Sequence, residues 1–169
     1  MRRTAPALLA LFLLAGCGTA APTVDVDDPM GTAGDAVASI GAIDIRDAAI
    51  APAEDVEGGI AHPAGSDVAL RFVAVNSGDA ADRLVSVSSP LAGDVDVSGE
   101  QALIGGSTLL VGDTGSAVPA AAASVTRATV TLDGLRRSLS VGPTYPVTLT
   151  FERAGSVTLE LPVDDPDRG

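Results

Sequence analysis

Apolar and polar residues alternate one by one along several short stretches of this chain. The clearest are Val147–Glu152 and Val157–Leu161, with Ala154 and Gly155 between them. Successive side chains of a β-strand point to opposite faces of a sheet, so strict alternation predicts strands with one buried face. The two stretches and their short connection therefore predict a β-hairpin.

The same reading extends over most of the chain. Further strands are predicted by alternation or by an apolar run at residues 40–50, 68–75, 83–88, 94–98 and 127–132. No segment shows the spacing of an amphipathic helix. About seven to eight short strands, separated by glycine-containing turns, predict an all-β protein folded as a β-sandwich of the immunoglobulin-like kind.

Composition limits both the core and the chemistry of this domain. Hydrophobic residues make up 46 % of the chain but aromatic residues only 2 %, so the core has to be aliphatic. A net charge of −12 excludes nucleic acid as a partner, because phosphates are bound through Lys and Arg. With no Lys, one Cys and one His, the chain cannot form a Schiff base, an internal disulfide or a multi-histidine metal centre. These exclusions argue against an enzyme.

The start of the chain looks like an export signal. Arg2 and Arg3 precede the apolar run Ala5–Leu14, which is too short to span a bilayer but has the length of a secretory signal core. The following Leu14–Cys17 resembles the lipobox of bacterial lipoproteins, which implies cleavage before Cys17 and acylation of its thiol. We expect acyl chains such as palmitate to hold the protein on the extracytoplasmic face of the cell membrane.

The chain divides into four predicted parts. Residues 1–16 are the lipoprotein signal peptide, and residues 17–37 are the lipidated cysteine followed by a flexible spacer rich in Gly, Ala, Pro and Asp. Residues 38–163 form the β-sandwich, and residues 164–169 form a disordered acidic tail. A lipid anchor, rather than electrostatic attraction, would hold so acidic a protein at a membrane.

Several segments together resemble the PCu(A)C-type copper chaperones. They are Asp82–Pro90, Val95–Val97, Asp133–Arg136, Pro146–Glu152 and Gly155–Val163, which follow one another in the order found in that family. The resemblance implies a cupredoxin-like β-sandwich that works outside the cytoplasm. Many members of the family move Cu(I) toward cytochrome oxidase assembly, and actinobacterial members are often lipoproteins.

The copper ligands of the family are missing here. The resemblance places the first ligand His at Ser98, a ligand Met in the following loop, and the His-x-Met pair at Thr129 and Thr131. The expected loop, residues 99–115, contains no Met. Cu(I) is a soft ion that prefers thioether, thiolate and imidazole, which a hydroxyl group does not replace. Outside these positions His62 is the only imidazole, and a lone His is more often a turn or surface residue than a ligand.

Three hypotheses follow. The first is a membrane-anchored binding or interaction module of the cell envelope, with a protein partner there and without a cofactor. The second is a copper chaperone that delivers Cu(I) through unconventional ligands. The third is an aspartic protease, because Asp113–Ser116 resembles the Asp-Thr-Gly loop; such an enzyme needs two carboxylates that share a proton. We discount this third hypothesis, because nothing else in the chain resembles that family and a turn of Asp-Thr-Gly-Ser explains the motif without catalysis.

Overall fold

The computed structural model describes residues 34–112, 122 and 124–164, all within the compact unit Thr32–Gly169. These residues form twelve strands and no helix, so no membrane-spanning helix occurs in this part of the chain. The strands are β1 (Ala36–Ile40), β2 (Ile43–Ile50), β3 (Ile60–His62), β4 (Val68–Asn76), β5 (Asp82–Ser88), β6 (Asp94–Gly99), β7 (Ala102–Leu103), β8 (Thr108–Val111), β9 (Val125–Asp133), β10 (Leu139–Ser140), β11 (Thr144–Phe151) and β12 (Gly155–Pro162).

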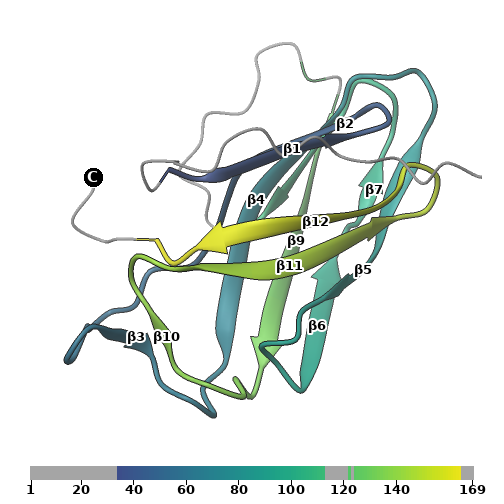
Figure 1. Ribbon diagram of the computed structural model, residues 1–169. Helices are drawn as coiled ribbons and strands as arrows, with labels where there is room; N and C mark the ends of the chain where they lie inside the picture. The colour runs from purple at the N-terminus through teal and green to yellow at the C-terminus, as the bar shows by residue number, and fades with distance from the viewer. Residues whose placement is uncertain (1–33, 113–121, 123, 165–169) are drawn as a thin grey trace, which may run out of the picture. The chain divides into compact units, whose positions relative to one another are not determined.

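Two large sheets pack face to face. The first has the strand order β1-β2-β4-β8-β9-β6, with an additional pairing of β4 and β9, and the second has the order β12-β11-β5-β7. A small third sheet joins β10 to β3. In Figure 1, β11 and β12 lie across β4 and β9. All strand pairs are antiparallel except β8 with β9, which run parallel.

The core lies between the two large sheets and is almost entirely aliphatic. Leu70 and Phe72 of β4, Val130 of β9, and Leu149 and Phe151 of β11 are each at most 2 % exposed. All five belong to one continuous hydrophobic cluster. Burial of such side chains stabilises a fold by about 1.5–3 kcal/mol each, which is the main force that holds the sheets together. The aliphatic β-sandwich predicted from the sequence is therefore confirmed.

The hairpin of β11 and β12 has the expected register. Thr148 lies opposite Thr158, and Phe151 lies opposite Gly155, so the chain reverses through the residues between the two strands. On the outer face, the hydroxyl oxygens of Thr148 and Thr158 are 2.8 Å apart. Alternation thus identified both the strands and the inward-facing side chains of this hairpin.

The structure has more strands than the seven or eight expected. Segment 40–50 divides at Gly41, whose φ of +57° turns the chain from β1 into β2. β7 and β8 lie within the segment 99–115, which was expected to be a loop. All four residues of β8 are buried, so its sequence shows no alternation. β3, β7 and β10 contain only two or three residues, too few for a pattern.

Both ends of the domain extend beyond the predicted limits. β1 begins at Ala36, so the last two residues of the expected spacer, Ala36 and Val37, belong to a strand. At the other end, Asp164 was expected to begin a disordered tail, but its carboxylate accepts a hydrogen bond from Arg71. The signal peptide, Cys17, and residues 165–169 lie outside the described residues.

Candidate functional site

The positions that correspond to copper ligands in the resemblance lie on two paired strands. In the register of β6 and β9, Ser98 is opposite Thr129, and Asp96 is opposite Thr131. Directly opposed residues share one face of a sheet, with Cβ atoms about 4.5–5.5 Å apart. The alternate residues of β9, such as Val130, face the core. Ser98, Thr129 and Thr131 therefore gather on the outer face of the six-stranded sheet, at its β6 edge.

The turn after β6 holds this edge in place. Gly99 has a φ of +89°, and a Cβ atom there would lie 2.7 Å from the carbonyl oxygen of Arg127. The amide of Glu100 donates to the same carbonyl at 2.9 Å, and the side chain of Gln101 donates to the carbonyl of Val97 at 3.4 Å. The backbone of this site is thus well fixed, although the side chains on it are small.

These side chains do not suit Cu(I). Ser98 and Thr129 are exposed, Thr131 is half-buried, and no hydrogen bond to their hydroxyl groups occurs among the described residues. A hydroxyl is a hard, uncharged donor, whereas Cu(I) selects sulfur and imidazole. Strand pairing brings these three residues together, but their hydroxyl groups are not the donors that Cu(I) selects.

Carboxylates surround the same edge. Asp94 lies opposite Asp133, and Asp67 accepts a hydrogen bond from the amide of Gly134 at 2.8 Å. Desolvation, with the negative charges of Asp67, Asp96 and Asp94, raises the pKa of the Asp133 carboxyl above its ordinary value. Within the described ranges, no group of three or more His, Cys, Asp or Glu side chains is arranged to hold a metal ion.

His62 lies in a different part of the fold. It belongs to β3, which pairs with β10 in the small sheet, and its Nε2 atom is 2.9 Å from the carbonyl oxygen of Ala51. A ring nitrogen at this distance from a carbonyl oxygen donates its proton, so this atom has no free lone pair for a metal. Cys17, Met30 and the protease-like segment Asp113–Ser116 lie outside the described residues.

Arg71 is the first functional group that the sequence analysis missed. It is 9 % exposed, and its guanidinium donates to Asp35 at 2.8 Å, to Asp164 at 3.0 Å and to the carbonyl of Asp47 at 3.1 Å. Burial lowers its pKa, but the hydrogen bonds to Asp164 and Asp35 outweigh that effect and raise the pKa above its usual value. Arg71 thus ties the segment before β1 and the segment after β12 to the central strand β4.

Asp82, the first residue of β5, is the second missed group. Its Oδ1 atom accepts from the amides of Arg83 at 2.7 Å and Arg153 at 3.0 Å, and its Oδ2 atom accepts from Ala154 at 2.9 Å. Burial raises the pKa of Asp82, but these amide donors lower it overall. Asp82 therefore fixes the tip of the β11–β12 hairpin to the start of β5.

Comparison with solved structures finds PCuAC domains. The "Apo PCuAC domain from PmoF1" aligns with a TM-score of 0.57 and 21 % identity, over 77 % of this chain and 99 % of that one. The "Copper-bound PCuAC domain from PmoF2" gives 0.55 and 24 %, over 77 % and 98 %. The "apo PmoF2 PCuAC domain" gives 0.54 and 26 %, over 78 % and 96 %. These similarities show a shared fold.

A comparison with curated proteins finds no match, but the comparison with protein-family models agrees with the structural result. A protein-family model described as "Putative lipoprotein LpqE-like" matches residues 43–163, which span β2 to β12 and include the whole of the β6–β9 edge. Since this match covers well over half of the chain, and since the solved relatives share the sandwich, the chain belongs to the LpqE-like family and carries a domain with the PCuAC fold.

Proposed function

We propose that this protein is a lipid-anchored module of the cell envelope whose PCuAC-type domain no longer binds Cu(I). The observation that carries the proposal is the Ser98–Thr129 pair with Thr131 beside it, where the resemblance calls for imidazole and thioether groups. The domain keeps the strand pairing and has hydroxyl groups in place of ligands. With hydroxyl groups in place of copper ligands, the domain would bind a protein partner on the extracytoplasmic face of the membrane.

The supply of soft donors in the whole chain supports this proposal. The sequence contains one His, one Cys and two Met. The Nε2 atom of His62 donates to the carbonyl of Ala51, and lipidated Cys17 would be a thioether at the membrane surface and would no longer offer a thiolate. A Cu(I) site assembled from Met30 and His62 would have two donors at most. Tight and selective Cu(I) binding depends on several soft ligands in one place.

The membrane anchor rests on the sequence around Cys17 and on the description of the matching family as lipoproteins. Two acyl chains bind a bilayer stably, since each buried CH₂ contributes about 0.8 kcal/mol. The domain itself has acidic residues along its β6–β9 edge, which gives it no attraction to anionic lipid. Anchoring through Cys17 would therefore keep the domain near the membrane while leaving its surfaces accessible.

A Cu(I) titration against a competing chelator tests the loss of copper binding. We expect the wild-type chain to take up no Cu(I) from the chelator. Tight one-to-one binding would overturn the proposal and favour the alternative, a copper chaperone with unconventional ligands. In that case the His62→Ala variant identifies the ligand: loss of binding would assign His62 to the copper site.

Membrane fractionation of cells that express the Cys17→Ala variant tests the anchor. We expect the variant to leave the membrane fraction or to stay unprocessed, because it has no thiol to acylate. Thr19→Ala, a change two residues further along, is the matched control and should remain anchored. A mature, membrane-bound Cys17→Ala protein would show that the lipobox interpretation is wrong.

A further inference from the structure

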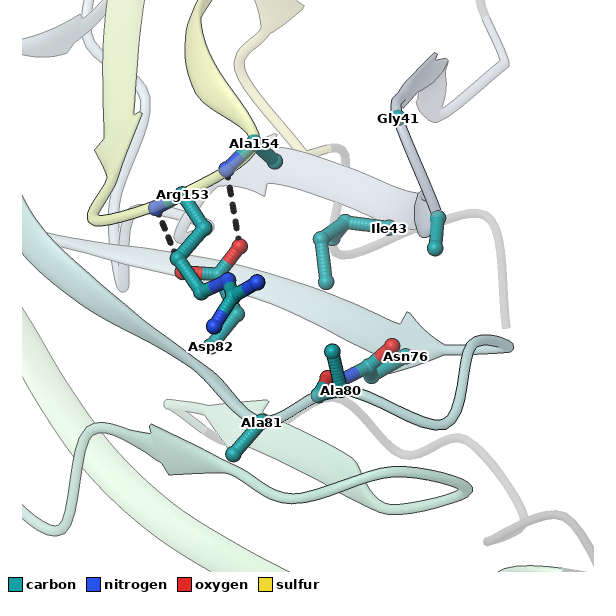
Figure 2. A pocket seen from close by; sticks show the side chains of 9 residues that line it. Gly41, Ile43, Asn76, Ala80, Ala81, Asp82, Arg153 and Ala154 are labelled. Carbon is teal, nitrogen blue, oxygen red and sulfur yellow. Dashed lines mark hydrogen bonds between the residues drawn. The ribbon is translucent and has the colours of Figure 1, made fainter.

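A hollow of about 210 Å³ lies at one end of the sandwich and includes none of the residues of the β6–β9 edge. Three connections form it: the turn from β1 to β2, the loop from β4 to β5, and the tip of the β11–β12 hairpin (Figure 2). Most of its lining consists of small apolar groups, with two charged residues at one side. The lining residues are Gly41, Ala42, Ile43, Asn76, Ala80, Ala81, Asp82, Arg153 and Ala154.

The walls of this hollow are held by hydrogen bonds and by close packing. The side-chain amide of Asn76 donates to the carbonyls of Ala80 at 2.8 Å and Leu103 at 3.0 Å, and its oxygen accepts from the amide of Gly78 at 3.0 Å. A Cβ atom on Gly78 would lie 2.9 Å from that of Ala42, so the first two connections touch. The third connection, the tip of the β11–β12 hairpin, is held by the hydrogen bonds that Arg153 and Ala154 donate to Asp82. The hollow is thus formed before any ligand arrives.

Opposite charges lie at its rim. In the view of Figure 2 the Arg153 side chain extends toward the Asp82 carboxylate, and its positive charge helps to lower the pKa of that carboxyl. The Oδ2 atom of Asp82 accepts one hydrogen bond, from Ala154, and a carboxylate oxygen can accept two. Among the described residues the guanidinium of Arg153 makes no ion pair within 4.0 Å and no hydrogen bond. Both groups can therefore still bind a ligand.

We propose that this hollow binds a free α-amino acid with an aliphatic side chain. The side chain would contact Ile43 and the surrounding alanine methyl groups, the ammonium group would donate to Asp82, and the carboxylate would accept from Arg153. An anion alone would meet the negative charge of Asp82, and a cation alone would meet Arg153, whereas a zwitterion satisfies both. The volume is below the roughly 300–1,000 Å³ typical of sites for drug-sized ligands, which fits a ligand of this size.

The test titrates the isotope-labelled full chain with three ligands of one carbon skeleton and follows backbone amide signals by NMR. The ligands are L-leucine, 4-methylpentanoate, which lacks the ammonium group, and 3-methylbutylamine, which lacks the carboxylate. We expect leucine to shift the signals of Ala81, Arg153 and Ala154. Each analogue should bind about tenfold more weakly or worse, because it loses one of the two charge-assisted hydrogen bonds to the protein. Absence of leucine-dependent shifts, or equal binding of all three, would overturn the proposal.

The Arg153→Gln variant separates binding from folding. It keeps the backbone amide that donates a hydrogen bond to Asp82, so the hairpin tip should stay in place. The melting temperature should fall only slightly, through the lost attraction between Arg153 and Asp82. Its affinity for leucine should fall about tenfold or more, because a charge-assisted hydrogen bond is lost. Arg127→Gln, which changes an exposed arginine of β9, is the matched control and should bind leucine like the wild type. Unchanged binding by Arg153→Gln would contradict the assignment.

Discussion

The polar residues of the β6–β9 edge and those around Arg71 and Asp82 differ in how much the stability of the fold depends on their hydrogen bonds. At the edge, Ser98 and Thr129 face solvent, and no hydrogen bond engages their hydroxyl groups among the described residues. Arg71 makes at least three hydrogen bonds to distant parts of the chain, and Asp82 accepts two from the hairpin tip and one from its neighbour Arg83. The hydroxyl groups of the first region hold no other described part of the fold in place, so we expect these residues to tolerate substitution. The second region maintains the sandwich.

Replacement of Arg71 should give the largest loss of stability, and therefore the clearest difference between the two regions. Arg71→Ala removes the guanidinium that donates to the carboxylates of Asp35 and Asp164 and to the carbonyl of Asp47. Breaking a fully buried ion pair costs about 3–5 kcal/mol, but the two carboxylates are partly exposed, so we expect a loss of about 2–4 kcal/mol. Denaturant unfolding measures this loss. Arg127→Ala, on the exposed face of β9, should stay within about 0.5 kcal/mol of the wild type.

Replacement of Asp82 should give a smaller loss that depends on pH. Asp82→Ala leaves three backbone amides without their charged acceptor, and we expect a loss of about 1–3 kcal/mol at neutral pH. Because the folded state lowers the pKa of Asp82, its contribution is full above the unfolded value near 4. The contribution disappears as the pH falls through the lower, folded value.

Unfolding of the wild type and Asp82→Ala as a function of pH measures this contribution. The stability difference between them should be constant near neutral pH and should narrow in acid. A difference that does not change with pH would show that the carboxylate charge plays no part in holding the hairpin tip.

A change at the β6–β9 edge should have the smallest effect and the opposite sign. The pKa of Asp133 is raised in the fold, so its ionised form is disfavoured there by desolvation and by Asp67, Asp96 and Asp94. Asp133→Asn should therefore slightly stabilise the protein at neutral pH, and its melting temperature should be slightly higher than that of the wild type. The gain should vanish as the pH falls and the wild-type carboxyl becomes protonated. Destabilisation by Asp133→Asn would mean that this edge also has a structural role.

Sequence could predict the hairpin and the edge because both depend on local patterns. Val147–Phe151 alternates without interruption, and the residue pairs of β6 and β9 follow once their strands are placed. The contacts of Arg71 could not be predicted, because its partners Asp35 and Asp164 are 36 and 93 residues away in the chain. A single charge within the apolar run 68–75 was the only signal. β8 was missed because both of its faces are buried, which removes the alternation.

The hollow near Asp82 shows the same limit. Asp82 and the amide of Arg153 are 71 residues apart, and nothing in either local sequence marks their meeting. Gly78 was visible as a turn signal, whereas Gly41 lay within the segment 40–50 that was predicted as a strand. Even a correct turn signal does not say which other loop the turn will touch. Sites made of several connections are set by the packing of the sheets, whereas sites on paired strands can be predicted from strand pattern and family motif together.

The central claim is that the β6–β9 edge retains the frame of a copper site without its donors. The most direct test compares Cu(I) binding by the wild type and by the triple variant Ser98→His, Thr129→His, Thr131→Met, with Ser98→Ala, Thr129→Val, Thr131→Val as the control without donors. Our account predicts that the wild type and the control take up no Cu(I) from a competing chelator, while the triple variant binds it measurably. Tight binding by the wild type, or a folded triple variant that binds no better than the control, would contradict it.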